Sequence, residues 1–375
     1  MTRRETPPFR ADHVGSLLRP KELLLARDQR QQDRITAAEL RAVEDEAVRD
    51  VVRLQEEIGL QTVTDGEFRR ASWHMDFIYR LHGISRTTEP IQVHFRNEQG
   101  DLDFTSAGLK VDDKVCLDDD DAPIFGADFT FLQSVASTGT PKLTIPSPSM
   151  VHYRGGRAAL DPEVYPEEEE FWADLSAAYA RQVKEIAALG CTYLQLDDTS
   201  LAYLNDPAQR ADIAARGDDA EHQHERYITQ INAALADRPE GLAVTTHMCR
   251  GNFRSSWVAE GGYDFVAEAL FGRLDVDGFF LEYDDARSGG FEPLRFVPPG
   301  KLVVLGLVTT KRPQLESKDD LKRRIDEAAR FVPLEQLCLS GQCGFSSTVE
   351  GNDLTLEEEV AKLRLIIETA AEVWG

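Results

Sequence analysis

The sequence has no surplus of positive charge. Its 375 residues include 66 acidic side chains against 42 lysines and arginines, which gives a formal net charge of −24. Nucleic acids and anionic membranes need a positive protein face, so both are disfavoured as partners. A solvated acidic surface accounts for the charge. The four consecutive aspartates at 118–121 fit a solvated turn better than a calcium loop, whose ligand spacing differs.

Long apolar runs are missing as well. No run reaches the ~18 consecutive apolar residues of a membrane-spanning helix, and the mean hydropathy is −0.37. The segment from Met1 to Pro8 lacks the apolar core of a secretory signal peptide. These absences predict a cytoplasmic protein that does not enter a membrane.

Cysteine is scarce, with five residues spread over the whole chain. Disulfide frameworks belong to small, cysteine-dense secreted chains, so reduced thiols or metal ligands are favoured here. A glycine-rich phosphate loop is also absent from the strand-to-helix turns. The usual sequence signature of a nucleotide-binding enzyme is therefore lacking.

Strand-like and helix-like segments alternate from about Lys142 to the C-terminus. The apolar runs 192–196, 242–244 and 278–281 are examples, and each is followed by polar residues. Such alternation is typical of parallel α/β folds. The number of units favours an eight-stranded (βα)8 TIM barrel over an open sheet. No sequence repeat or linker demands a second domain, so one domain is predicted over 1–375.

The first 140 residues follow another pattern. Thr36 and Glu39 form a capping-box pattern before apolar residues at helical spacing, which predicts a helix that ends before Gly59. Around residues 85–140 the segments alternate as hairpin strands do. We therefore expect the TIM barrel to carry an N-terminal extension and a hairpin insertion.

A His and a Cys lie two residues apart at the end of one strand-like run. Side chains two apart on a strand point to the same face, so His247 and Cys249 project together. Glu282 and Cys343 close or follow later strand-like runs. In a TIM barrel the C-terminal ends of the strands meet at one face. This mixed nitrogen, sulfur and oxygen set suits zinc.

Single buried His or Cys residues are more often structural than functional. The remaining cysteines, Cys116, Cys191 and Cys338, are interpreted in that way. The recurrence of ligand-type residues at equivalent strand ends favours a metal site for the other set.

Acidic residues also follow two of the strand-like runs. Glu67 lies in a loop, and Asp197 and Asp198 follow the run 194–196. Carboxylates at these positions suit a cationic substrate group such as an α-amino group. The alternative for Asp198 is capping of the next helix.

These segments resemble the cobalamin-independent methionine synthase family, in particular its short, single-barrel bacterial members. The resemblance runs from Phe9 to the C-terminus. It is most specific in 249–254 and 278–284, and it includes the residues at 14–16, 66–67 and 195–198.

The resemblance implies zinc held by His247, Cys249, Cys343 and, at rest, Glu282. Homocysteine would bring its thiolate to zinc and displace Glu282. Its amino group would be held by Glu67 and Asp197, and its carboxylate by Val14, Gly15 and Ser16. Zinc lowers the pKa of a bound thiol, and a thiolate-rich shell keeps the sulfur nucleophilic.

The chain departs from the full-length members of that family. Those enzymes carry a second, N-terminal barrel that helps to bind polyglutamylated folate. They also use a proton-donating His where this chain has Lys311 close by in the stretch 307–313. His13, His74 and His152 are further candidates for the proton donor. The Trp that stacks on the folate ring has no match here.

We expect an enzyme that transfers a methyl group to homocysteine to give methionine. The donor is a methylfolate, a methylcorrinoid protein or another small methyl compound, and the partners are small molecules. The alternative is another zinc-dependent thiol alkyltransferase, resembling epoxyalkane:coenzyme M transferase. It would need a cationic sulfonate pocket, for which the sequence offers Arg69, Arg70, Arg250 and Arg254. A non-catalytic zinc protein is disfavoured by the Glu ligand. A homodimer is compatible with the sequence.

Overall fold

The centre of the molecule is a parallel β-sheet of six strands. The computed structural model describes residues 4–87, 91–97, 100–106, 108–117 and 122–375. In the sheet, the strands lie in the order β12-β11-β10-β9-β8-β7, so each strand lies beside its successor in the sequence. The strands are β7 (Leu143–Pro146), β8 (Tyr193–Asp197), β9 (Ala243–Met248), β10 (Gly278–Glu282), β11 (Leu302–Val308) and β12 (Leu337–Gly341).

Two further parallel pairings lie next to the edges of this sheet, and the first forms a two-stranded sheet of its own. β1 (Thr62–Val63) pairs in parallel with β6 (Thr140–Pro141), which leads through Lys142 into β7. At the other edge Ala11 forms a parallel bridge to Leu339 of β12. These pairings confirm the α/β class. They do not close the sheet, and the (βα)8 barrel stays a prediction.

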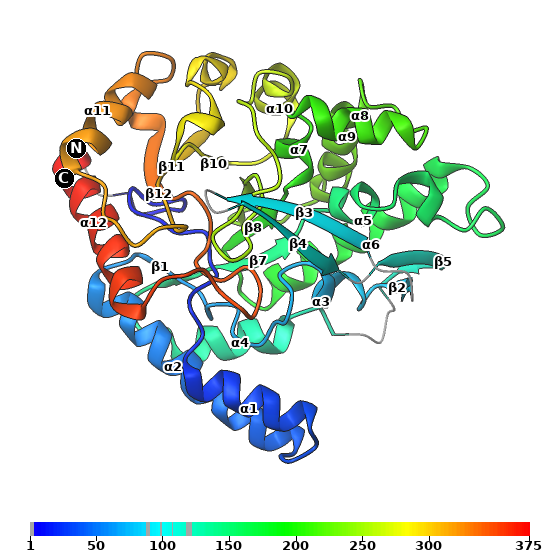
Figure 1. Cartoon of the computed structure of the whole chain (residues 1–375), viewed down its shortest axis with the longest axis horizontal. Helices are drawn as coiled ribbons and strands as arrows, with labels where there is room; N and C mark the ends of the chain where they lie inside the picture. Colours follow the sequence, from blue (N-terminus) through cyan, green and yellow to red (C-terminus); the bar gives the residue numbers. More distant parts are fainter. Residues whose placement is uncertain (1–3, 88–90, 98–99, 107, 118–121) are drawn as a thin grey trace.

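Helices surround the strands, as Figure 1 shows. The long ones are α1 (Lys21–Gln31), α2 (Ala37–Ile58), α4 (Gly126–Val135), α6 (Glu168–Ala188), α8 (Pro207–Ala215), α9 (Gln223–Leu235), α11 (Lys318–Ala328) and α12 (Leu356–Trp374). The shorter ones are α3 (Met75–Ile78), α5 (Ser149–Tyr153), α7 (Ser200–Tyr203), α10 (Ala267–Arg273) and the 3₁₀ turns η1 (Gly156–Ala159), η2 (Ala286–Ser288), η3 (Glu292–Phe296) and η4 (Leu334–Gln336). None of the helices in the described ranges combines the length and apolar character needed to cross a bilayer.

The helix predicted after Thr36 is α2, and its capping box is confirmed. The Thr36 side chain accepts from the Glu39 backbone N–H, and the Glu39 side chain bonds back to Thr36. Gly59 ends the helix in the left-handed region at a φ of 96°, where glycine is favoured.

The hairpins predicted around residues 85–140 are confirmed as antiparallel pairs. β2 (His82–Arg86) pairs with β5 (Leu109–Cys116), and β3 (Ile91–Asn97) pairs with β4 (Gly100–Ser106). The helix α4 within this stretch was not expected. The aspartate run at 118–121 lies outside the described residues.

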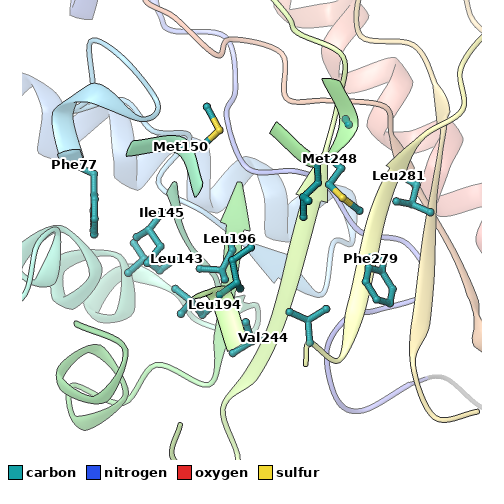
Figure 2. Close-up of a cluster of buried hydrophobic side chains, with 14 of the residues drawn as sticks. Phe77, Leu143, Ile145, Met150, Leu194, Leu196, Val244, Met248, Phe279 and Leu281 are labelled. Atoms are coloured by element: carbon teal, nitrogen blue, oxygen red, sulfur yellow. The ribbon is translucent and has the colours of Figure 1, made fainter. Parts of the chain in front are cut away.

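The strands bury both of their faces. Phe279 and Leu281 of β10 point into the large core between sheet and helices, as do the side chains drawn in Figure 2. Phe280, between them, packs on the opposite face with Val304 and Cys338. Burial on both faces requires near-continuous apolar strands, and it places the predicted structural Cys338 in the interior.

Candidate metal and substrate site

Three of the four predicted metal ligands come together. The ligand atoms of His247, Cys249 and Cys343 all lie within 4.8 Å of one another, and all three residues are buried. The two sulfur atoms are 3.6 Å apart. β9 and β12 are three strands apart, which in a flat sheet is about 14 Å. The sheet therefore curves strongly enough to bring the ends of these strands to one site.

The electrostatics of the group favour a bound cation. The neighbouring Cys343 thiol and burial raise the pKa of Cys249 well above its ordinary value. Burial lowers the pKa of His247, but Cys249 and Asp197 outweigh it and raise that pKa overall. A bound metal cation would favour the thiolate form of both cysteines and so lower the pKa of Cys249. One imidazole and two thiols are a donor set that fits zinc among the common metals.

A carboxylate orients the imidazole of this group. Nδ1 of His247 lies 3.4 Å from Oδ1 of Asp197, and Nε2 lies 3.3 Å from the carbonyl oxygen of Gln342. Metal-binding histidines commonly donate their second N–H to a carboxylate. Gln195 fixes Asp197 in turn, since its side-chain amide donates to Asp197 Oδ1 and to the Val14 carbonyl, both at 2.7 Å.

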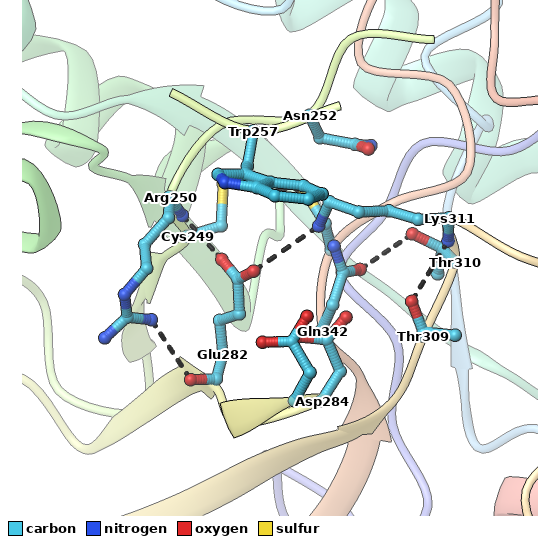
Figure 3. A network of polar contacts seen from close by, with 12 residues as sticks. Cys249, Arg250, Asn252, Trp257, Glu282, Asp284, Thr309, Thr310, Lys311 and Gln342 are labelled. Atoms are coloured by element: carbon cyan, nitrogen blue, oxygen red, sulfur yellow. Dashed lines mark hydrogen bonds and ion pairs between the residues drawn. The ribbon is translucent and has the colours of Figure 1, made fainter. Parts of the chain in front are cut away.

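Glu282 lies at the end of β10 but is not one of the three clustered ligands. Its Oε2 accepts from the Arg250 backbone N–H at 2.5 Å. Its Oε1 is 2.7 Å from Arg287 Nη2 and 3.4 Å from Lys311 Nζ. Figure 3 shows Arg250 and Lys311 meeting the carboxylate from different sides. Burial opposes ionisation, but Lys311, Arg287 and Arg250 hold the pKa of Glu282 well below its usual range.

The two acidic residues predicted to bind an amino group are close to this site. Glu67 has a positive φ of 61° in the loop after β1. Its Oε1 accepts from Thr144 Oγ1 at 2.8 Å, whereas its buried Oε2 has no hydrogen-bond partner in the described chain. Burial raises the pKa of Glu67, Arg70 lowers it and Asp197 raises it further, so the net shift is upward. A cationic group between Glu67 and Asp197 would stabilise the two carboxylates and so oppose the upward shift of the Glu67 pKa.

The loop Val14-Gly15-Ser16 forms part of the same site. Gly15 has a φ of 144°, and a Cβ there would lie 2.8 Å from Thr144 Cγ2. Thr64 Oγ1 donates to the Gly15 carbonyl at 2.6 Å, and Phe345 N donates to the Ser16 carbonyl at 2.9 Å. The loop is thus fixed between the chain after β1 and the chain after β12.

A cavity of about 230 Å³ joins these groups. Its lining includes Val14, Ser16, Glu67, Asp197, His247, Cys249 and Cys343. An aromatic and cationic part of the wall was not foreseen from the sequence, and comprises Trp73, Arg86, Phe95, Phe104, Arg154, Tyr203 and Phe253. Phe95 and Phe104 come from the β3–β4 hairpin, which is attached by two backbone hydrogen bonds between Arg96 and Trp257.

The proton-donor candidates occupy different places. Lys311 is buried beside Glu282. His13 is buried 3.4 Å from the Thr62 carbonyl, and burial together with Lys142 lowers its pKa to about 4. Among the described residues, His74 lines the cavity whereas Lys311, His13 and His152 do not.

Two alternatives from the sequence can be compared with the geometry. Asp198 accepts from Ser200 Oγ at 2.6 Å and from the Leu201 N–H at 3.0 Å, so it bonds to the first turn of α7, although the N-cap residue of that helix is Thr199. The four arginines considered for a sulfonate pocket do not line the cavity. Its arginines are Arg86 and Arg154, on irregular or edge segments that carry no sequence motif.

Comparison with known proteins identifies relatives over the whole chain. The family described as "Cobalamin-independent synthase, Catalytic domain" matches residues 152–372. The uncharacterized protein YxjG of Bacillus subtilis (strain 168) is 48% identical over 373 residues, which covers 99% of this chain and 96% of that protein.

Two other relatives carry functional names. The methionine synthase of Pyrococcus abyssi is 23% identical over 340 residues, covering 91% of this chain and 87% of that enzyme. A crystal structure from Listeria monocytogenes, provisionally named a vitamin-B12 independent methionine synthase, is 36% identical with a TM-score of 0.77. It covers 99% of this chain and 100% of its own. With the clustered His and Cys side chains at its strand ends, this chain belongs to the cobalamin-independent methionine synthase family of methyltransferases.

Proposed function

We propose that the protein is a zinc-dependent enzyme that transfers a methyl group to the thiol of homocysteine and so forms methionine. The observation that carries the proposal is one cavity shared by a His-Cys-Cys group and by two buried carboxylates, Glu67 and Asp197. A single amino-acid thiol in this cavity could therefore meet the sulfur-binding group and the amine-binding carboxylates at the same time.

His247, Cys249 and Cys343 would hold the zinc, with Glu282 as a fourth, exchangeable ligand. When bound, zinc lowers the pKa of a substrate thiol so that the thiolate forms near neutral pH. The donor set supports zinc because mixed His, Cys and carboxylate shells are common for this ion.

Glu67 and Asp197 would bind the amino group of homocysteine. The unpartnered Oε2 of Glu67 offers an acceptor to an ammonium N–H, and a hydrogen bond between two charged groups is stronger than a neutral one. The segment Val14-Gly15-Ser16 would bind the substrate carboxylate through its backbone N–H groups and the Ser16 hydroxyl. Amino-acid recognition then sets the sulfur next to the metal ligands.

The methyl group would move by in-line displacement from the donor to sulfur. A new C–S bond forms as the bond between the methyl carbon and the donor breaks, and the donor leaves with that electron pair. Lys311 would supply a proton to the departing donor. His13 is the second residue proposed for this step, although its buried ring faces Thr62.

The donor would be a methylfolate or another methyl carrier, bound at the aromatic and cationic part of the wall. We also infer that residues 1–375 form one domain and that the curved sheet closes as a (βα)8 barrel. The parallel pairings of β1 with β6 and of Ala11 with Leu339 support closure, because they extend the six strands from both edges.

A second candidate is a thiol alkyltransferase acting on coenzyme M or a similar sulfonate. Arg86 and Arg154 in the cavity wall favour it, because a guanidinium binds a sulfonate well. The buried carboxylates Glu67 and Asp197 oppose it, since they would repel the sulfonate.

X-ray absorption at the zinc edge, with and without homocysteine, tests the proposal. We expect stoichiometric zinc whose shell gains a sulfur and loses an oxygen when homocysteine is added. The variant Glu67→Gln should keep its zinc but bind homocysteine roughly ten- to hundredfold more weakly. A shell that responds to coenzyme M alone would favour the second candidate, and protein without zinc would refute both.

A further inference from the structure

The carboxylate of Glu282 is already engaged on both oxygens by groups of this chain. Oε2 accepts from the Arg250 N–H at 2.5 Å, and Oε1 is shared by Arg287 at 2.7 Å and Lys311 at 3.4 Å. The Glu282 side chain is fully buried, and the side chains of Arg287 and Lys311 are 9% and 4% exposed. Water therefore screens these contacts little.

We propose that Arg287 and Lys311 are positioning residues that compete with the metal for the carboxylate of Glu282. By this competition they keep the fourth ligand weak and easily displaced by the substrate thiol. The inference rests on the proposed function, in which Glu282 ligates zinc and gives way to homocysteine.

The charge balance explains how displacement is made easy. A carboxylate that leaves a metal inside a protein becomes an unpaired buried charge unless cations are in place. Glu282 has two such cations within 3.4 Å. Its negative charge is stabilised whether or not the metal holds it, so the free-energy difference between the two arrangements is small.

Arg287 is held in position independently of Glu282. Its Nε lies 3.0 Å from Asp285 Oδ2, and its Nη2 lies 3.1 Å from Asp284 Oδ1. Its guanidinium also lies over the Trp257 ring, 4.6 Å from the centroid. The guanidinium therefore keeps its position when the Glu282 carboxylate moves toward a metal. A group that competes with the metal for Oε1 must be fixed in this way.

The test is the zinc affinity of Arg287→Met, measured by competition with a chromophoric chelator. Removing the competitor should raise the affinity about ten- to hundredfold, the usual range for a hydrogen bond to a charged group. A merely structural role would lower it. Arg287→Lys retains the charge and should stay close to the unaltered protein.

Two controls separate competition from a change in the general electric field. Arg295→Met removes the same charge from an exposed position in the turn η3 and should leave the affinity unchanged. In a Glu282→Gln background, Arg287→Met should no longer raise the affinity, because the contested carboxylate is gone. A rise that persists in this background would overturn the proposal.

The second readout is the homocysteine concentration that displaces the oxygen ligand from zinc. By thermodynamic linkage it should increase in Arg287→Met by the same factor as the zinc affinity. Unchanged or weaker zinc binding by Arg287→Met overturns the inference while the proposed function stands. If this variant does not fold, Lys311→Met decides, with a rise of the same sign. An unaltered protein that binds no zinc refutes the proposed function itself.

Discussion

At the residue scale, the clustering of the three proposed metal ligands was predictable, because strand periodicity fixes the direction of each side chain. His247 lies near the end of β9, Cys249 directly follows that strand and Cys343 follows β12, so the three clustered residues could be named without a structure. The ion pair of Glu282 with Arg287 could not be predicted in this way. Arg287 lies in a 3₁₀ turn and has no periodic relation to the strand.

The two clustered thiols lead to a prediction about metal content. Cys249→Ser and Cys343→Ser should each lose stoichiometric zinc, since each removes one of the two adjacent thiols proposed as zinc ligands. Metal analysis of the purified variants measures this directly. Cys338→Ala is the matched control, because that thiol is buried among Val14, Phe280 and Val304 and should be dispensable for zinc. Full zinc content in both serine variants would refute the ligand assignment.

At the scale of elements, amphipathic and capping signals located the helices better than the connections. The capping box at Thr36 was evident from two side chains three residues apart. Helix α1, which was not predicted, is rich in charged residues and buries only Leu23 and Ala26. Trp73 and Arg154 line the cavity from segments outside the main strands and helices, where no period marks them.

Gly15 packs closely against Thr144, which bonds to Glu67, one of the residues proposed to bind the amino group. A Cβ at this position would press on Thr144 Cγ2, and Thr144 Oγ1 donates to Glu67 Oε1. Gly15→Ala should therefore displace Thr144 and weaken homocysteine binding by about tenfold or more, with zinc content unchanged. Calorimetric titration of the zinc-loaded protein with homocysteine measures the affinity, and metal analysis measures the zinc content.

Gly59→Ala provides the control for backbone strain alone. Gly59 also has a positive φ, of 96°, but no heavy atom lies within 4 Å of a Cβ built there. It should lose stability by about 1–2 kcal/mol and keep its affinity for homocysteine. Equal affinity for homocysteine in the two alanine variants would show that Gly15 has no role in substrate recognition.

At the scale of the whole molecule, the alternation of segments predicted the α/β class, which the parallel sheet confirms. It also predicted a (βα)8 barrel, whose closure stays a prediction. Strands that follow one another in the sequence are usually neighbours in a sheet, and each of these six strands lies beside its successor. Closure would depend on the short segments at 10–15 and 62–64. Their contacts include side-chain bonds such as Thr64 Oγ1 to the Gly15 carbonyl, and such bonds leave no pattern in a sequence.

A buried carboxyl on the last helix should make the stability of the whole chain depend on pH. Glu359 of α12 is fully buried, its Oε2 accepts from the Leu18 N–H at 2.8 Å, and its Oε1 has no partner in the described chain. Burial raises its pKa from 4.5 to about 8. Between these values the folded state binds more protons than the unfolded state, so this group lowers the stability as the pH rises.

The variant Glu359→Gln isolates this effect, because a neutral amide imitates the protonated carboxyl at every pH. The difference in melting temperature between the variant and the unaltered protein should grow in favour of the variant as the pH rises from about 5 to 9. Glu357→Gln, an exposed change on the same helix, should show no such gain at high pH. A difference for Glu359→Gln that is constant with pH would mean that the carboxyl does not titrate with folding, and that its hydrogen bond to the loop after Ser16 is its whole contribution.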